Sequence, residues 1–343
     1  MAGHLVLVQT VGVRVPAPQH IYMGHFVQKI FSGSSNPLLA EKISIDISSK
    51  LGLIHLDRFS DGEIWIKYEE NLRGNDIYLV QSTNAPAENI LELALMIDAA
   101  RRASSQRINV VIPYFGYSRQ DRKVSPRVPI SAKVVMDLFC EAGADRIITM
   151  DLHSTAIQGF TSIPVDNLYG SMVLLPAVKN YFNNQKTENI AVLSPDMGSS
   201  KLNQRYAKWL SSDFALIDKR RYEHNQSEVV AVVGNLENKH ILMVDDIIDT
   251  AGTIINAAKV AKERGALSVT VAATHGVFSG QAIEKIESSD IDKVFITDTI
   301  ANNNRKLINK IETISSSKVF AEAITRVHTG GSVSELFKTR NIL

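Results

Sequence analysis

Short, continuously apolar runs alternate with segments of helical periodicity along most of the chain. In the first half this pattern predicts strands at residues 29–31, 77–81, 108–113 and 145–150, and helices at 37–51, 90–102 and 130–142. In the second half it predicts strands at 190–193, 214–217, 241–244, 269–273 and 294–297, and a helix at 254–264. Apolar strands that alternate with helices are typical of parallel sheets covered on both faces. We therefore expect an α/β fold of two similar domains, each a mainly parallel sheet flanked by helices.

The length of 343 residues suits roughly two domains of about 150 residues each. We predict an N-terminal extension (1–28), an N-terminal α/β domain (29–170) and a C-terminal α/β domain (171–343), with the last helix packing back on the first domain. The extension precedes the first acidic residue, Glu41. It lacks the charged start of a signal peptide and the Arg and Ser content of a transit peptide. We interpret it as dispensable and leave an organellar address open.

Charge and cysteine content exclude several classes of protein. The chain has 37 Lys and Arg against 36 Asp and Glu, a net charge of +1, which removes the electrostatic argument for binding nucleic acid or an anionic membrane. No apolar run approaches the roughly 18 residues of a membrane-spanning helix. The single cysteine, Cys140, excludes an internal disulfide and a cysteine metal cage. We expect a cytoplasmic enzyme with locally concentrated charge, and neither nucleic acid nor membrane as a partner.

Three of the apolar runs end in carboxylates, at the position where ligands bind in open α/β sheets. The groups at these strand ends are Asp151 with His153, Asp196, and the pair Asp245 and Asp246. One such carboxylate usually caps the next helix. Three together with a histidine indicate a site for a hard cation such as Mg²⁺, which takes oxygen ligands along with substrate phosphates.

The stretch from Asp245 to Thr253 lies between a buried strand and a helix. Its Thr250-Ala251-Gly252-Thr253 portion places hydroxyl and free backbone N–H groups at a helix N-terminus, which binds phosphate with help from the helix dipole. The acids before it can accept hydrogen bonds from sugar hydroxyls or hold the waters of Mg²⁺. The combination indicates a sugar phosphate, and the alternative is an N-capped helix with an acidic turn. The nine residues resemble the phosphoribosyl-diphosphate motif of type I phosphoribosyltransferases.

Neither a P-loop nor a Rossmann glycine motif is present in the sequence. Three other stretches offer groups that recognise nucleotides: residues 58–63, 114–123 and 218–221. The first has an aromatic face and carboxylates, and the other two have Arg and Lys clusters that suit a polyphosphate or a transferring phosphoryl group. On the residues alone, the alternatives are a turn between strands, a solvated basic loop and a surface charge run.

Together these motifs resemble the ribose-phosphate diphosphokinase (phosphoribosyl pyrophosphate synthetase) family, from about Lys29 to the C-terminus. The matching stretches are 31–36, 58–63, 71–74, 113–123, 150–153, 164–169, 218–221 and 245–253. The resemblance implies type I phosphoribosyltransferase-like domains. It also implies a Mg²⁺-dependent transfer of the diphosphoryl group of ATP to the C1 hydroxyl of ribose 5-phosphate, with release of AMP, for nucleotide biosynthesis. The family further implies a homo-oligomer, typically a hexamer, activated by phosphate and inhibited by ADP.

The resemblance also assigns roles to residues of this chain, motif by motif. For ATP it implies Phe59, Asp61, Gly62 and Glu63, which reach the site of a neighbouring subunit, together with Arg119 and Gln120. For the metal it implies His153 and Asp196, and for catalysis Lys219 and Arg221. For ribose 5-phosphate it implies Arg221, Asp245, Asp249, Thr250, Ala251, Gly252 and Thr253. For regulation the candidates are Arg73, Arg127, Ser332 and Phe337.

The chain departs from the family in the diphosphate loop, which usually reads Pro-Asp-x-Gly-Gly. Here Ser199 replaces the second glycine, and a serine resists a positive φ. The basic residue often found shortly after this loop is Leu202, preceded by Lys201. We expect these changes to affect affinity on the diphosphate side.

Two other functions stay open on the sequence. A phosphoribosyltransferase would need only the 245–253 motif and one domain, and the stretches 58–63 and 119–120 argue against it. A non-catalytic regulatory subunit should lose loop or metal residues, whereas the predicted catalytic and metal residues are all retained.

Overall fold

The first half of the chain forms a five-stranded parallel sheet. The computed structural model describes residues 27–220, 229–302 and 307–338. The strand order is β1-β4-β5-β6-β7, and every neighbouring pair is parallel. The strands are β1 (Gln28–Ser32), β4 (Asp76–Val80), β5 (Arg107–Ile112), β6 (Arg146–Met150) and β7 (Val165–Leu168). All five residues of β4 are buried, as expected for a strand covered on both faces.

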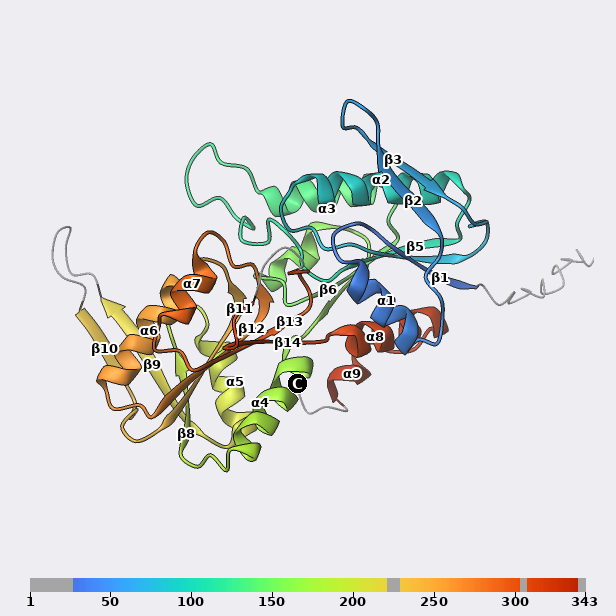
Figure 1. The fold of residues 1–343 in the computed structure, drawn as a ribbon. Helices are drawn as coiled ribbons and strands as arrows, with labels where there is room; N and C mark the ends of the chain where they lie inside the picture. The colour runs from blue at the N-terminus through green and yellow to red at the C-terminus, as the bar shows by residue number, and fades with distance from the viewer. Residues whose placement is uncertain (1–26, 221–228, 303–306, 339–343) are drawn as a thin grey trace, which may run out of the picture.

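Helices cover both faces of this sheet (Figure 1). One face carries α2 (Glu88–Arg102), α3 (Ser131–Ala142) and the 3₁₀ helix η1 (Thr155–Phe160). The other face carries α1 (Pro37–Asp46), α8 (Ser317–Thr329) and the short α9 (Glu335–Lys338). The last described segments of the chain therefore pack on the first sheet. Local chemistry sets the helix ends: the Asn36 side chain accepts from the N–H of Leu39 at the start of α1, and α3 stops at Gly143, whose φ of 118° favours glycine.

The second half forms a seven-stranded sheet in the order β10-β9-β8-β11-β12-β13-β14. Only the edge pair β10–β9 is antiparallel among the described strands of this sheet. The strands are β8 (Ile190–Ser194), β9 (Asp213–Arg220), β10 (Val229–Val233), β11 (His240–Ile248), β12 (Ser268–Gly276), β13 (Lys293–Thr297) and β14 (Ile311–Ile314). Helices α6 (Gly252–Glu263) and α7 (Ala282–Glu287) cover one face, and α4 (Ser171–Asn184) and α5 (Ser200–Leu210) cover the other.

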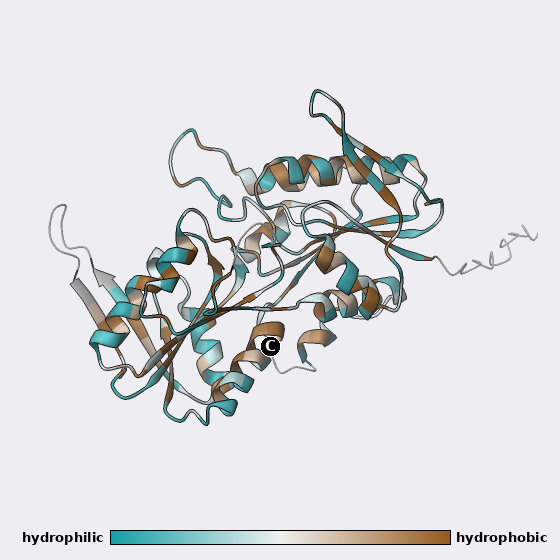
Figure 2. Cartoon of the chain, viewed as in Figure 1, coloured by the Kyte–Doolittle hydropathy of each residue, from teal (hydrophilic) through white to brown (hydrophobic). Residues whose placement is uncertain are grey.

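A two-stranded hairpin extends from the first domain. Its strands are β2 (Ile54–Arg58) and β3 (Ile64–Tyr68), which pair antiparallel. The hairpin projects beyond the helices at the top of Figure 1. Figure 2 shows hydrophobic residues along the strands of both sheets and hydrophilic residues on the outward sides of the helices. None of the described helices combines the length and the apolar character that a membrane crossing requires.

The structure confirms the two mainly parallel sheets flanked by helices. All nine predicted strands and all four predicted helices are present, with shifted ends. The helix predicted at 37–51 is too long, because α1 stops at Asp46, Ser48 adopts a φ of 59°, and Leu51 forms a bridge with Ile30. β11 is longer than predicted and contains Asp245 and Asp246. β1 begins at Gln28, inside the predicted extension, whereas residues 1–26 lie outside the described residues. The domain division near residue 170 stays a prediction.

A buried ion cluster fixes α8 to the first sheet. Asp76, at the start of β4, is fully buried. Its Oδ1 accepts from Nε of Arg107 at 2.8 Å, and its Oδ2 lies 2.9 Å from Nδ1 of His328 in α8. Burial acts to raise the pKa of Asp76, but the hydrogen bonds with Arg107 and His328 hold the pKa below its usual value. The charged form of Asp76 is therefore part of the packing between α8 and the first sheet.

We expect Asp76→Asn to lower the free energy of unfolding by about 3 kcal/mol at pH 7, because Arg107 and His328 lose their buried counter-charge. The depressed pKa means that Asp76 stabilises the fold above the unfolded value of about 3.9, and that this contribution is lost as the pH falls through the folded pKa. The difference between the two proteins should therefore shrink below about pH 4. Urea titrations of both proteins at pH 7 and below about pH 4 measure the difference in the free energy of unfolding. Asp98→Asn, which removes an exposed ion pair with Arg102, is the control and should cost less than about 1 kcal/mol. Equal stability of wild type and Asp76→Asn at pH 7 would contradict this account.

Candidate active site

The carboxyl ends of the two sheets face each other. His275, at the end of β12, places Nε2 3.0 Å from the carbonyl oxygen of Met150, at the end of β6. His153, which follows β6, places Nδ1 2.7 Å from Oδ2 of Asp246 in β11. Polar groups of both sheets thus meet in one junction, at the end of the strands where open α/β sheets bind ligands.

The pKa values of two adjacent acids in this junction shift in opposite directions. Burial, followed by the charge of Asp246, raises the pKa of Asp245. Burial also acts to raise the pKa of Asp246, but the hydrogen bond with His153 and its charge lower that pKa overall. The same hydrogen bond raises the pKa of His153. Negative charge is therefore concentrated on Asp246, beside an imidazole that favours its protonated form.

Arg119 connects the predicted ATP side with the predicted ribose side. It follows β5 of the first sheet, and its Nη1 donates to Oδ2 of Asp249, just after β11, at 2.6 Å. Burial acts to raise the pKa of Asp249, but hydrogen bonds with Ser279 and Arg119 lower it, so Asp249 stays ionised. Gln120 points elsewhere: its Oε1 accepts from Oγ of Ser131 at 2.6 Å, at the start of α3.

The predicted sugar-phosphate motif forms the turn from β11 into α6. Ala251, directly before the helix, has a φ of 63°, and Thr250, Gly252 and Thr253 are exposed. A Cβ atom on Gly252 would meet only Oγ1 of Thr250, at 3.9 Å, so the space beside this glycine is open. Backbone N–H groups in the first turn of a helix have no partner within the helix. The turn is therefore available to an anion.

Asp196 lies in the turn between β8 and α5. Its Oδ1 accepts from the backbone N of Ser199 at 3.0 Å and from Oγ of Ser199 at 3.2 Å. The charge of Asp196 also contributes to the raised pKa of Asp245, which indicates that it lies near the acid pair. Ser199 has a φ of −85°, so this turn does not require glycine and the expected strain is absent.

The predicted adenine-binding residues lie away from this junction, at the tip of the β2–β3 hairpin (Figure 1). These residues are Phe59, Asp61, Gly62 and Glu63, and all four are exposed. The backbone N–H of Phe59 donates to the carbonyl of Glu63 at 2.9 Å, and Gly62 supplies the φ of 94° that the turn requires. Phe59 is 55% exposed, which leaves it available to another molecule.

The two predicted catalytic residues lie at the edge of the described structure. Lys219 belongs to β9, next to the antiparallel strand β10. Arg221 falls outside the described residues.

The four regulatory candidates are spread over the chain. Arg73 and Arg127 are exposed, and Arg127 has a φ of 65°. The carbonyl of Ser332 accepts from Nη1 of Arg326 at 3.1 Å, and the ring of Phe337 meets Tyr169 edge to face with centroids 4.9 Å apart.

Sequence reasoning placed Asp151 among the strand-end acids of a cation site but gave no role to its neighbours in the junction, Thr274 and His275. Oδ2 of Asp151 accepts from Oγ1 of Thr274 at 2.5 Å and from the N–H of Gly170 at 2.9 Å. Burial nevertheless raises the pKa of Asp151 to about 6. A Cβ atom on Gly170 would lie 2.1 Å from Oγ1 of Thr274, so this approach requires glycine. Thr274 and His275 directly follow the apolar run 269–273, and the strand-end rule used for the acids would have found them.

Comparison with protein-family models covers both halves of the chain. Residues 28–143 match a model described as the N-terminal domain of ribose phosphate pyrophosphokinase. Residues 216–338 match a model described as the phosphoribosyl synthetase-associated domain.

Relatives of known identity match the chain along most of its length. A ribose-phosphate pyrophosphokinase of Chlorobaculum tepidum is 49% identical over 314 residues, which are 92% of this chain and 96% of the relative. Another, of Coxiella burnetii, is 49% identical over 313 residues, 90% of this chain and 97% of the relative. The crystal structure of phosphoribosylpyrophosphate synthetase from Mycobacterium smegmatis has a TM-score of 0.83 at 34% identity, with 89% of this chain and 99% of that chain covered. The fold and the resemblance predicted from the motifs are confirmed, and the chain belongs to the ribose-phosphate pyrophosphokinase family.

Proposed function

We propose that this chain transfers the diphosphoryl group of ATP to the C1 hydroxyl of ribose 5-phosphate, which gives 5-phosphoribosyl 1-diphosphate and AMP. The contact of Arg119 with Asp249 is the observation that supports this best. It joins a cation suited to polyphosphate with the sugar-phosphate motif, and two substrates that react with each other need adjoining sites. The names of the relatives support the same reaction.

The turn before α6 suits ribose 5-phosphate. Free N–H groups and the hydroxyls of Thr250 and Thr253 can donate to the 5-phosphate, while Asp245 and Asp249 can accept from ribose hydroxyls. A sugar held at both ends has little freedom left, and fixing a reactant in this way contributes substantially to catalysis.

The reaction needs charge neutralisation more than covalent help. The C1 oxygen attacks the β-phosphorus of ATP, the bond from that phosphorus to the bridging oxygen of the α-phosphate breaks, and AMP leaves with the bonding electrons as the C1 hydroxyl gives up its proton. We propose that Arg119, Lys219 and Arg221 neutralise the negative charge on the transferring diphosphoryl group.

The donor chemistry of the junction fits a Mg²⁺ ion. Among the described residues no group of three or more His, Cys, Asp and Glu side chains could hold a metal by itself. Mg²⁺ usually takes only one or two carboxylates together with substrate phosphates and waters. We propose His153 and Asp196 as its protein contacts. A cation there would offset the negative charge of Asp246 and Asp196, which together with burial, the larger cause, raises the pKa of Asp245. When bound, the ion would neutralise charge on the ATP phosphates.

The exposed hairpin tip supports a site shared between subunits. We propose that Phe59, Asp61, Gly62 and Glu63 contact adenine bound to a neighbouring copy of the chain, with Gln120 as a further ATP contact. A cytoplasmic homohexamer that is activated by phosphate through Arg73, Arg127, Ser332 and Phe337 stays a prediction of the family resemblance.

Purified protein should form AMP and 5-phosphoribosyl 1-diphosphate from ATP and ribose 5-phosphate without any nucleobase, because the acceptor is the sugar hydroxyl. The measurement is AMP formation by chromatography, with and without ribose 5-phosphate, Mg²⁺ and phosphate. Chelation of the metal should abolish product. Activity that requires a nucleobase would favour a phosphoribosyltransferase, and an inactive protein that alters another synthetase would favour a regulatory subunit.

Lys219→Ala should lower the turnover number by roughly 100-fold or more, because a cation on the transferring group acts mainly in the transition state. The KM values for both substrates should change by less than about threefold. Steady-state kinetics of AMP formation measure both quantities. Lys259→Ala on α6, where the side chain is 70% exposed, is the matched control and should behave as wild type. An unchanged turnover number in Lys219→Ala would remove Lys219 from the mechanism.

A further inference from the structure

The sheet of the second domain has its topological switch point between β8 and β11. After β8 the chain adds β9 and β10 on one side, and it then returns to the other side of β8 to add β11, β12, β13 and β14 in that order. Open α/β sheets bind ligands at such a point, outside the carboxyl ends of the two strands. Asp196, proposed to contact the metal, follows β8, and Asp245, proposed to accept from ribose, lies near the end of β11. The relative position of these two strand ends therefore matters for the site.

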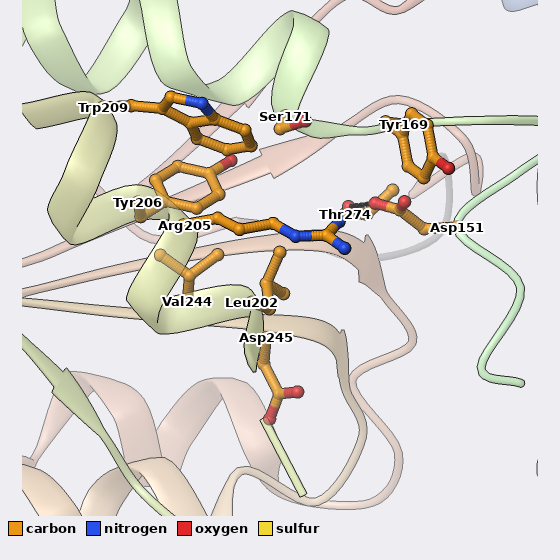
Figure 3. A pocket seen from close by; sticks show the side chains of 10 residues that line it. All are labelled: Asp151, Tyr169, Ser171, Leu202, Arg205, Tyr206, Trp209, Val244, Asp245 and Thr274. Carbon is orange, nitrogen blue, oxygen red and sulfur yellow. Dashed lines mark hydrogen bonds between the residues drawn. The ribbon is translucent and has the colours of Figure 1, made fainter. Parts of the chain in front are cut away.

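The two strands part before they reach these acids. Their parallel pairing ends at Val192 and Leu242, two residues before Val244. Helix α5, which follows β8, packs against β11 beyond this point, where Leu202 of α5 lines the same small cavity as Val244 and Asp245 (Figure 3). The N–H and the carbonyl of Val244 on this side consequently need partners other than β8.

The side chain of Asn203, on α5, supplies both partners. Its Oδ1 accepts from the N–H of Val244 at 2.8 Å, and its Nδ2 donates to the carbonyl of Val244 at 2.7 Å. The amide thus takes the place of a neighbouring strand. Because an N–H only donates and a carbonyl only accepts, these two bonds fix the orientation of the amide. Asn203 is completely buried, so bulk water does not compete for these groups.

The same amide is connected to the turn that holds Asp196. Its Nδ2 also donates to the carbonyl of Ser199 at 3.0 Å, and that carbonyl accepts from the backbone N–H of Asn203 at 3.0 Å. Ser199 donates from its N–H and from its Oγ to Oδ1 of Asp196. A continuous series of hydrogen bonds therefore joins the carboxylate of Asp196 to the backbone of β11, one residue before Asp245.

We propose that Asn203 is a positioning residue: its amide bridges the gap between β8 and β11, and so fixes the distance between Asp196 and Asp245. The departure at Ser199 noted in the sequence belongs to this series, because its hydroxyl supplies one of the two hydrogen bonds to Asp196. The effect on substrates rests on the proposed function, since Asn203 acts through the two acids. The bridge to β11 does not rest on it, and each effect has a separate measurement.

The first measurement is amide hydrogen exchange of the protein without substrates, followed by mass spectrometry of peptides. Asn203→Leu, which has a similar volume, leaves the N–H of Val244 without its acceptor. Exchange in a peptide that spans β11 should become at least about tenfold faster than in wild type, whereas exchange in a peptide that spans β4 should not change. Gln204→Leu removes an exposed amide from the next position of α5 and should match wild type in both peptides. Equal exchange of β11 in wild type and Asn203→Leu would overturn the bridge.

The second measurement is calorimetry of ribose 5-phosphate binding without ATP. Asn203→Leu should raise the Kd about tenfold, because Asp245 is no longer held where it can accept from the sugar. In steady-state kinetics of AMP formation the KM for ATP should change by less than about threefold, because the residues proposed to contact adenine lie on the hairpin of the first domain. An unchanged Kd for ribose 5-phosphate would overturn the positioning of Asp245.

A double-mutant cycle tests the connection to Asp196. Ser199→Ala removes one hydrogen bond to Asp196 and should raise the half-saturating concentration of Mg²⁺ in AMP formation by about threefold. The same substitution should have a clearly smaller effect in the Asn203→Leu background, where the turn is already released from β11. Additive effects of the two substitutions would overturn the connection.

Asn203→Thr keeps one donor and one acceptor on a shorter side chain, and it decides the same questions if Asn203→Leu does not fold. It should lie between Asn203→Leu and wild type in the exchange of β11 and in the Kd for ribose 5-phosphate. Identity with wild type in both measurements would overturn the proposal. A wild-type protein that neither binds ribose 5-phosphate nor forms AMP would refute the proposed function, and the exchange experiment would still decide whether Asn203 bridges the strands.

Discussion

The neutral imidazole of His275 is the interaction on which the arrangement of the two sheets depends. The side chain is buried, with Nε2 at 3.0 Å from the carbonyl of Met150 and Nδ1 at 2.9 Å from Oγ1 of Thr299. Because a carbonyl oxygen only accepts, Nε2 carries the proton, and Nδ1 accepts from the hydroxyl of Thr299. Burial lowers the pKa of His275 to about 4, so the ring stays neutral with one donor and one acceptor. It joins β6, β12 and the segment after β13 without adding charge to a junction already crowded with acids.

The charges of the junction are balanced across the two sheets rather than within each sheet. Arg119, which follows a strand of the first sheet, pairs with Asp249, which follows a strand of the second. His153 of the first domain likewise pairs with Asp246 of the second. The groups that would bind substrates are therefore the groups that hold the domains together. An anionic substrate bound by Arg119 would compete with Asp249, which would couple substrate binding to the contact between the domains. The net charge of +1 for the whole chain does not reveal this local separation of basic and acidic groups between the two sheets.

The predictable part of the fold is the part that local patterns determine. Continuous apolar runs identified the central strands, because such strands are buried on both faces whatever their neighbours are. The hairpin β2–β3 gave a weak signal, since none of the residues in its two short strands is fully buried and only β2 alternates regularly between partly buried and exposed positions. The contact between α8 and the first sheet depends on Asp76 and His328, which are 252 positions apart in the chain. A local pattern shows that α8 has an apolar face but cannot identify the surface that the face covers.

The same distinction between local patterns and distant contacts applies to the candidate site. Strand-end acids and the turn before α6 follow from sequence, because each belongs to a short segment whose chemistry is complete in itself. The partners of these groups do not follow from sequence, because they lie far away along the chain. Arg119 is 130 positions from Asp249, and Thr274 is 123 positions from Asp151. Asp151 adopts a φ of 40°, which is unfavourable for a non-glycine residue. Its hydrogen bonds to Thr274 and to the N–H of Gly170 offset that cost, and no larger residue than glycine fits at position 170. The strained backbone, the glycine and the threonine are unremarkable in isolation. They become a unit only when the carboxyl ends of the two sheets are brought together, which is also the condition for a shared site.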